Sequence, residues 1–217
     1  MGSPTPRHSM IEYLHALNID TRLLKRAATI LNEGGLVAYP TDTSWSIGCS
    51  IQSRVGVAKL QKLKGGKSFT PTIMCREISQ WSEFANVDTA QFRFVKPLVP
   101  GPFVFIFRSL GSFEKKFDIK RPAVGLRIPN HPVPLALIEA LGHPLFSSTA
   151  SRVMTDLGWW DSGFAEENLF EYGYELEDIP GVDLILDHGD SLPKQLSTVL
   201  DLTEDEPRLI RQGCGVL

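Results

Sequence analysis

Short apolar runs, each bounded by glycine or proline, alternate with segments of helical periodicity along most of this sequence. The first pair sets the pattern. Residues 21–33 repeat apolar side chains at helical spacing, and Gly34-Gly35 ends that segment. Residues 36–39 are all apolar and are ended by Pro40, which predicts a buried strand. Helices that alternate with buried strands predict an α/β fold, in which helices cover a sheet.

The same alternation continues to the end of the chain. We expect further helices over residues 53–64 and 132–141, and strands over residues 71–75, 103–107, 124–128, 144–146, 182–186, 198–202 and 208–211. Residues 41–49 are expected to form a loop, and the acidic residues 161–177 a mobile helix and loop. Because the sequence has no internal repeat and no long linker, we expect one domain over residues 1–217, with its core at about 21–215 and an N-terminal extension at 1–18.

Composition excludes several classes of protein. Hydrophobic residues make up 42% and charged residues 22% of the 217 residues, as in ordinary globular domains. No apolar run approaches the roughly 18 residues of a membrane helix, and the start lacks a secretory signal, so a cytoplasmic location without a membrane partner is expected. Cys49, Cys75 and Cys214 are far apart and fit neither a disulfide framework nor a zinc spacing, which predicts reduced thiols and no metal site.

Charge is unevenly distributed, although the net charge is only −3. All charged residues in 52–76 are lysine or arginine, whereas all those in 161–190 are aspartate or glutamate. Such a basic segment can attract phosphate, but it can also be the solvated face of a helix, which is the interpretation that we favour for Lys59 and Lys62. Lys64 differs, because it follows Leu60 by four positions and therefore projects along the buried stripe of its helix.

Two polar strings follow the first strand and the second helix. Thr41, Asp42 and Thr43 stand beyond the carboxyl end of a strand, where open α/β sheets bind ligands, although such a string also forms ordinary turns. Residues 65–68 end in Gly-Lys-Ser but are not a P-loop, because Gln61 replaces the first glycine and a helix precedes the string. Lys64 or Lys67 would contact a phosphate as a point charge.

Arg127 is the best placed of the candidate anion-binding residues. It ends a predicted strand and is followed by a helix that begins in a proline-rich segment, an arrangement suited to phosphate or carboxylate. His131 can cap that helix or transfer a proton, and the cap is the favoured interpretation. In the strand at 208–211, Arg208 and Arg211 lie on opposite faces, so one arginine has to face the core or a cleft.

Hydroxyl side chains gather at two further strand ends. Residues 147–151 include Thr149 and Ser151, and Ser197 precedes the strand at 198–202. These hydroxyls can bind phosphate oxygens or a ribose, but they are also common in caps and turns.

Taken in order, these strings resemble the YrdC/YciO/threonylcarbamoyl-AMP synthase family over about residues 21–215. The family string GG-x-V-x-YPTDT-x-Y-x-LGC is matched by residues 34–49, with Trp45 for the tyrosine and Ser46 for the glycine that follows it. PGP is matched by residues 100–102, V-x-R-x-P-x-HP by 124–132, STVVDLT by 197–203 and R-x-G by 211–213.

The resemblance implies a single YrdC-like α/β/α domain with a twisted mixed sheet and a large concave basic cavity. It implies that L-threonine, bicarbonate and ATP, with Mg²⁺, are converted to threonylcarbamoyl-AMP and pyrophosphate for the modification of tRNA. By position, it assigns Lys64, Lys67 and Arg127 to catalysis, Thr41, Thr43 and Thr149 to the substrate threonine, and Arg127, Ser151, Ser197 and Arg211 to the nucleotide.

Two departures bring the sequence nearer to the YciO branch of that family. The synthases carry K-x-R where this chain has residues 64–66, and S-x-N where it has residues 149–151. Two functions are therefore expected as alternatives. One is the synthase reaction, and the other is binding of a nucleotide or of double-stranded RNA without efficient synthesis.

Overall fold

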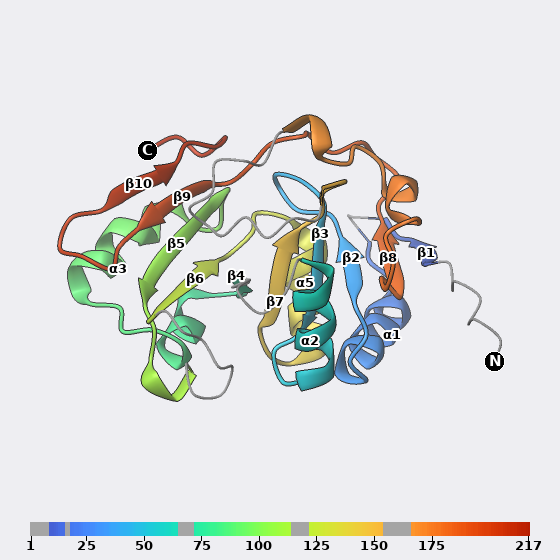
Figure 1. Ribbon diagram of the computed structural model, residues 1–217, viewed down its shortest axis with the longest axis horizontal. Helices are drawn as coiled ribbons and strands as arrows, with labels where there is room; N and C mark the ends of the chain where they lie inside the picture. The colour runs from blue at the N-terminus through green and yellow to red at the C-terminus, as the bar shows by residue number, and fades with distance from the viewer. Residues whose placement is uncertain (1–8, 16–17, 65–71, 114–121, 154–165) are drawn as a thin grey trace.

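The computed structural model describes residues 9–15, 18–64, 72–113, 122–153 and 166–217. Its strands form one ten-stranded mixed sheet that is not closed (Figure 1). The strands are β1 (Met10–Tyr13), β2 (Val37–Tyr39), β3 (Ser46–Ser50), β4 (Thr72–Met74), β5 (Phe103–Arg108), β6 (Ala123–Arg127), β7 (Leu145–Thr149), β8 (Leu184–Asp187), β9 (Thr198–Asp201) and β10 (Arg208–Arg211). Their order across the sheet is β1-β8-β2-β3-β7-β4-β6-β5-β9-β10.

Strand direction brings distant residues to one edge of the sheet. β2, β3 and β7 are successively antiparallel, so the end of β2, the start of β3 and the end of β7 coincide. Ser46 pairs with Tyr39 on one side and with Thr149 on the other. The loop 41–44 therefore lies beside the end of β7, although about 100 residues separate them in the chain.

Helices cover both faces of the sheet (Figure 1). α1 (Thr21–Asn32) and α5 (Pro132–Leu141) pack together on one face over apolar side chains of β2, β7 and β8. α2 (Arg54–Leu63) packs on the other face against β3. The expected layered α/β sheet is confirmed, and so are these three helices, which begin at side-chain caps on Asp20, Ser53 and His131.

Short helices close the rest of the second face. They are α3 (Thr89–Val95) and the 3₁₀ turns η1 (Ile78–Glu83), η2 (Lys96–Leu98), η3 (Glu166–Asn168) and η4 (Gly173–Leu176). Trp81 of η1 is fully buried, and its ring lies 5.9 Å from that of Phe105 and 5.5 Å from that of Phe107. This aromatic cluster anchors the β5 side of the sheet, because aromatic rings bury the largest apolar area per residue.

The structure corrects several sequence-based expectations. Residues 46–50 form β3 rather than part of a loop, and residues 10–13 of the expected extension form the edge strand β1, parallel to β8. The helical segment 78–98 was not expected. In the described part of the acidic segment, residues 166–177, only the short turns η3 and η4 form, and residues 161–165 lie outside the description. No helix in the described ranges is long and apolar enough to cross a bilayer.

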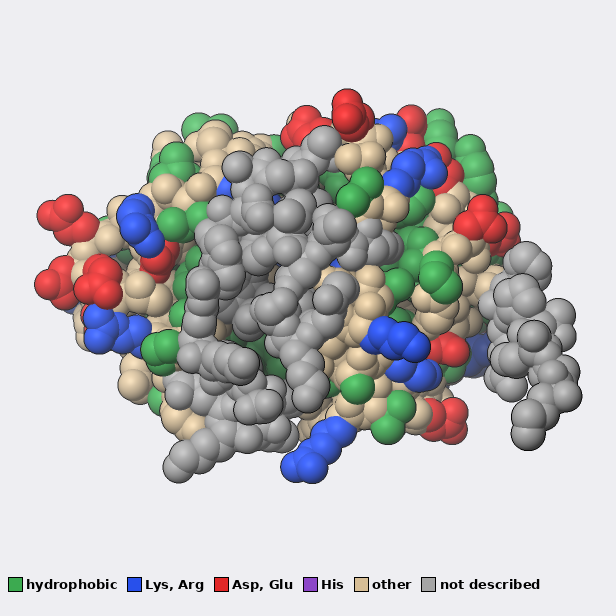
Figure 2. All heavy atoms as spheres, viewed as in Figure 1, with side chains coloured by type: hydrophobic (Ala, Val, Ile, Leu, Met, Phe, Trp, Pro, Cys, Tyr) green, Lys and Arg blue, Asp and Glu red, His purple; other side chains and the backbone are tan. Residues whose placement is uncertain are grey.

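The fold disperses the basic segment 52–76. Lys59 pairs with Asp183 at 3.8 Å, Arg76 pairs with Glu139 at 3.0 Å, and Lys64 is buried. On the described part of the face in Figure 2, lysine and arginine side chains alternate with acidic ones. The solvated-face interpretation therefore fits Lys59, and the large basic concavity expected from the resemblance is not shown by the described residues.

Candidate functional site

The loop 41–44 is organised by one hydroxyl. Thr41 Oγ1 accepts hydrogen bonds from the backbone N–H groups of Thr43 and Ser44, both at 3.2 Å, and donates to the Ser44 carbonyl at 2.7 Å. It also lies 3.1 Å from Thr43 Oγ1. Thr41 thus forms the hydroxyl turn that the sequence left open as an alternative, and that turn presents Asp42 and Thr43 to the end of β6.

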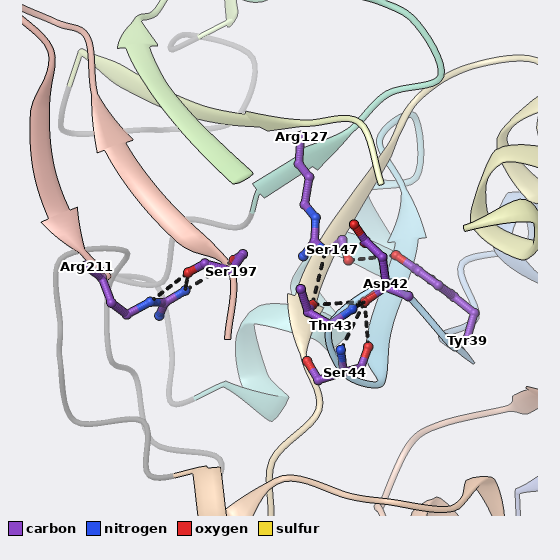
Figure 3. Close-up of polar contacts among 9 residues, drawn as sticks. Tyr39, Asp42, Thr43, Ser44, Arg127, Ser147, Ser197 and Arg211 are labelled. Atoms are coloured by element: carbon purple, nitrogen blue, oxygen red, sulfur yellow. Dashed lines mark hydrogen bonds and ion pairs between the residues drawn. The ribbon is translucent and has the colours of Figure 1, made fainter. Parts of the chain in front are cut away.

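Arg127 reaches this loop from the end of β6. Its Nη2 donates to Asp42 Oδ1 at 2.6 Å and to Thr43 Oγ1 at 3.1 Å (Figure 3). The two charged side chains are only 6% and 11% exposed. Arg127 Nε and Asp42 Oδ2 are buried and have no hydrogen-bond partner among the described residues. The ion pair therefore keeps one donor and one acceptor for a ligand that carries both kinds of group.

Arg211 and Ser197 form a second pair at the ends of β10 and β9 (Figure 3). Arg211 donates through Nε and Nη2 to the Ser197 carbonyl, at 3.1 and 3.0 Å, and through Nη2 to Ser197 Oγ at 3.3 Å. Burial, and secondly the positive charge of Arg127, lower the pKa of Arg211 to about 10. The two guanidinium groups are thus close enough to repel each other, which suits a site for a polyanion.

Two backbone contacts tie this second pair to its surroundings. The N–H of Gln195 donates to the Thr43 carbonyl at 3.4 Å, which brings the segment before β9 against the loop 41–44. The N–H of Cys214 donates to the Leu196 carbonyl at 2.9 Å, and a Cβ on Gly213 would overlap that same carbonyl oxygen. Only glycine therefore lets the C-terminal segment lie flat beside Ser197.

Lys64 and Thr149 meet at the same edge of the sheet. Lys64 caps the end of α2, is 1% exposed, and donates from Nζ to the carbonyl oxygen of Thr149. Burial lowers the pKa of Lys64 to about 7. Ala150 N donates to the Trp45 carbonyl at 2.8 Å, one residue beyond the loop 41–44. The expectation that Lys64 projects inward is confirmed, and its amine can gain or lose a proton near neutral pH.

Ser151 and His131 make contacts of their own with nearby backbone groups. Ser151 is buried, and its hydroxyl donates to the Asn168 carbonyl at 3.5 Å and accepts from Val153 N at 3.3 Å. Lys67 lies outside the described residues. His131 accepts at Nδ1 from Val133 N at 3.3 Å, so the prediction that it caps α5 is confirmed.

Two participants, Asp42 and Tyr39, were given no role by reasoning from the sequence. Asp42 stood inside the string that was singled out, but its pairing with Arg127 could not be read from spacing. Tyr39 donates to Ser147 Oγ at 2.7 Å across β3, which is possible because Gly48 lies between them and a Cβ there would come within 2.9 Å of the Tyr39 ring. That contact fixes the end of β2 from which the loop starts, and burial raises the pKa of Tyr39.

The arrangement suits recognition of anions and of a small zwitterion. Arg127, Arg211 and Lys64 supply positive charge, Thr43 and Ser197 supply hydroxyls, and Asp42 supplies one carboxylate. Within the described ranges, no cluster of three or more His, Cys, Asp or Glu side chains could hold a metal ion.

Known proteins are similar to this chain in sequence and in structure. The family model described as telomere recombination, for Sua5, YciO and YrdC, matches residues 29–213. The uncharacterized protein YciO of Escherichia coli K12 is 35% identical over 211 residues, which cover 95% of this chain and 97% of YciO. The threonylcarbamoyl-AMP synthase of Rattus norvegicus is 28% identical over 205 residues, covering 90% of this chain and 69% of the synthase.

Two solved structures extend the similarity to three dimensions. The crystal structure of E. coli YciO matches with a TM-score of 0.82 at 32% identity, covering 96% of this chain and 97% of YciO. P. abyssi Sua5, complexed with L-threonine, matches with a TM-score of 0.79 at 25% identity, covering 94% of this chain and 58% of Sua5. From the match over residues 29–213 and the identity to YciO, this chain belongs to the Sua5/YciO/YrdC family.

Proposed function

We propose that this protein is a threonylcarbamoyl-AMP synthase-like nucleotidyltransferase that joins L-threonine, bicarbonate and ATP into threonylcarbamoyl-AMP and pyrophosphate for tRNA modification. The observation that carries the proposal is the buried Arg127–Asp42 pair, in which one donor and one acceptor have no partner within the described ranges. Arg211 adds a second guanidinium within electrostatic reach of Arg127. The relatives that are named as this synthase, and the Sua5 structure with L-threonine, support the same reaction.

The Arg127 group, which consists of Arg127, Asp42 and Thr43, suits an amino acid as its ligand. Asp42 Oδ2, the unused acceptor, suits the ammonium of an amino acid, and Arg127 Nε suits its carboxylate. Thr43 Oγ1, which accepts from Arg127 Nη2 at 3.1 Å, adds a hydroxyl beside this pair. A zwitterion that spans this pair would satisfy two buried polar atoms, each of which otherwise costs stability.

The Arg211 group, which consists of Arg211 and Ser197, suits a nucleotide as its ligand. The bonds from Arg211 to Ser197 use Nε and Nη2 only, so Nη1 is the nitrogen that can bind a phosphate oxygen. Ser197 Oγ lies beside it. Repulsion between two nearby guanidinium groups is relieved when a polyphosphate binds between them, which favours ATP over neutral ligands.

Positioning and charge explain how such a site would promote the reaction. The threonine amine attacks the carbon of bicarbonate with loss of water, and an oxygen of the resulting carbamate attacks the α-phosphorus of ATP as the bond to the β-phosphate breaks. Lys64, with its pKa lowered to about 7, can accept the proton that the amine loses. Arg127 and Arg211 would stabilise the negative charge that develops on the departing pyrophosphate.

Mg²⁺ fits this site only together with ATP. Asp42 is the single acid in the described Arg127 group, so an ion would be held mainly by phosphate oxygens and water, as Mg²⁺ often is. When bound, it would supply further neutralisation of the triphosphate. The steps assigned to Arg127, Arg211 and Lys64 do not depend on a protein-built metal cage.

Pyrophosphate release tests the synthase proposal. With ATP, bicarbonate and L-threonine, the protein should release pyrophosphate in a threonine-dependent manner, and Arg211→Ala should lower the rate. Arg208→Ala is the matched control, because Arg208 lies on the same strand, is 73% exposed and pairs with Asp201. No threonine-dependent pyrophosphate above a protein-free control would refute the synthase activity.

A second candidate is a paralogue that binds nucleotide or double-stranded RNA without efficient synthesis. Ser151 favours it, because this residue stands where the synthases carry asparagine and its hydroxyl is engaged by backbone groups of residues 153 and 168. Calorimetry with ATP, AMP and duplex RNA separates the ligands. RNA binding requires a log affinity that falls linearly with log salt concentration, and a flat or absent response would exclude RNA.

A further inference from the structure

β8 ends at Asp187 and is followed by His188, two ionisable side chains that the proposed function does not use. Asp187 is buried, accepts from Gly189 N at 2.8 Å, and packs where Gly173 has no side chain, since a Cβ there would overlap its carboxylate. The His188 side chain is 7% exposed, and its Nδ1 lies 3.9 Å from Asp187 Oδ1. That nitrogen is buried and has no hydrogen-bond partner among the described residues. Such a group carries a cost that calls for a physical explanation.

The ring of His188 is fixed by two other rings. It meets Trp45 edge-on, with centroids 5.8 Å apart and planes at 85°, and it meets His131 at 5.5 Å and 56°. Trp45 is fully buried, and its Nε1 donates to the Glu171 carbonyl at 3.2 Å. His188 is therefore held against His131 by a side chain that cannot move away.

His131 has to be neutral to perform its structural role. Its Nδ1 accepts a hydrogen bond from Val133 N, the first turn of α5, and a protonated imidazole has no acceptor nitrogen. A positive charge would also oppose the dipole at the helix N-terminus. α5 begins five residues after Arg127, so the cap holds the segment that leads from Arg127 into the helix.

The ionisable groups that surround the two imidazoles shift the pKa of His131 in opposite directions. Asp187 lies beside His188, and Asp42, the partner of Arg127, lies within electrostatic reach of His131. Burial and then His188 lower the pKa of His131 to about 4, whereas Asp42 raises it. Without His188, one of the two effects that lower this pKa would be lost, and the raising effect of Asp42 would be less opposed.

We infer that His188 is a positioning residue: packed on His131 and backed by Asp187, it keeps His131 in the neutral form that caps α5, and it thereby holds Arg127 against Asp42. The inference rests on the proposed function only where ATP binding is the readout. It assigns a role to a side chain that contacts neither proposed ligand.

The first test is an NMR titration of the His131 ring, assigned with His131→Asn. His188→Ala removes both the covering ring and the repulsion, and should raise the His131 midpoint from about 4 by roughly one pH unit or more. His188→Phe keeps a covering ring and should give a midpoint between those of wild type and His188→Ala. If His188→Ala does not fold, His188→Phe alone is compared with wild type. Midpoints that are equal in wild type and both variants would overturn the inference.

The second test measures ATP affinity at pH 7.5 and pH 5.5. Relative to wild type, His188→Ala should lose affinity measurably at pH 5.5, in proportion to the fraction of His131 that is protonated there, and little at pH 7.5. In the His131→Asn background the loss should disappear, because asparagine caps a helix well but does not titrate. A loss that persists in that background would show that His188 acts by packing alone and would contradict the inference.

The two tests separate the inference from the proposed function. If wild type binds no ATP, the proposed function fails, while the order of the His131 midpoints still decides the role of His188.

Discussion

At the scale of single residues, Arg127 connects most of the contacts in the site. It is as buried as the core, it is neutralised by Asp42, and it holds the hydroxyl of Thr43. Burying an arginine and a carboxylate together costs desolvation that a structural pair seldom recovers in full. A binding role explains better why this sheet keeps a charged pair of which two atoms find no hydrogen-bond partner in the described part of the chain.

Replacing Arg127 by alanine should weaken ATP and threonine binding and destabilise the protein. Losing hydrogen bonds to a charged ligand costs about 1.5–3 kcal/mol, or at least about tenfold in affinity. The buried Asp42 left unpaired should cost about 3 kcal/mol of unfolding free energy. Calorimetry and urea unfolding measure the two effects.

The control for that change is Arg108→Ala on the neighbouring strand β5. Arg108 is exposed and pairs with Glu204 at 3.1 Å, so its removal should change the unfolding free energy by less than about 0.5 kcal/mol. Equal losses in the two variants would argue against a special role for Arg127.

Lys64 should leave a signature in the pH dependence of stability. Its pKa is lowered to about 7 in the folded protein, and in the unfolded chain it returns to about 10.5, so the unfolded state binds more protons between these values. Stability contributed by this group therefore rises with pH from about 7 to about 10.5. It is lost as pH falls through that window.

Urea unfolding of wild type and Lys64→Met at pH 7, 8 and 9 measures this contribution. The unfolding free energy of wild type, relative to that of Lys64→Met, should rise by up to about 1.4 kcal/mol for each unit of increasing pH. Comparing the two proteins cancels the buried thiols of Cys49 and Cys75, which are present in both. Lys62→Met, an exposed change on the same helix, should show no such slope; a slope for Lys62→Met equal to that for Lys64→Met would refute the assignment.

At the scale of elements, local signals predicted the helices well and the edges of the sheet poorly. α1, α2 and α5 follow from apolar periodicity and from stop signals that act within a few residues. β3 was predicted as part of the loop 41–49, because Pro40 ends the strand before it, and it exists by pairing with β2 and β7. β1 depends on β8, about 170 residues away, and no local pattern reports such a partner.

In the candidate site, too, local signals indicated some residues but not the contacts between distant segments. Strand ends pointed to Arg127, Ser197 and Arg211, and helical spacing pointed to Lys64. The sequence could not show that Asp42 neutralises Arg127 or that His188 packs on His131, because these contacts join segments that only the sheet order brings together.

The C-terminal segment gives a prediction at this scale. Gly213→Ala should lift the segment from Leu196, because the added Cβ overlaps a backbone carbonyl that cannot move independently. Ser197 and Arg211 flank that contact, so ATP affinity should fall together with stability. Gly111→Ala is the control, since a Cβ there meets nothing within 4 Å. An unchanged ATP affinity for Gly213→Ala would show that the segment does not support the nucleotide group.

At the scale of the whole molecule, the sheet order explains why the site residues are so dispersed in sequence. β2 and β7 deliver the loop 41–44 and Thr149, β6 delivers Arg127, and β9 with β10 delivers Ser197 and Arg211. β2 and β7 lie in one half of the strand order and β6, β9 and β10 in the other, so the contact of Asp42 with Arg127 joins the two halves. A site that depends on both halves should bind its ligands only in the folded protein, and each ligand should stabilise it by mass action.

The most direct test of one shared site is a calorimetric titration of L-threonine with and without ATP. Two ligands that contact adjoining groups should raise each other's affinity by the same factor. Wild type and Arg208→Ala should show this coupling. Arg211→Ala should bind ATP more weakly and should show no coupling between ATP and threonine. Threonine and ATP that bind independently in wild type, or coupling that survives in Arg211→Ala, would contradict the account.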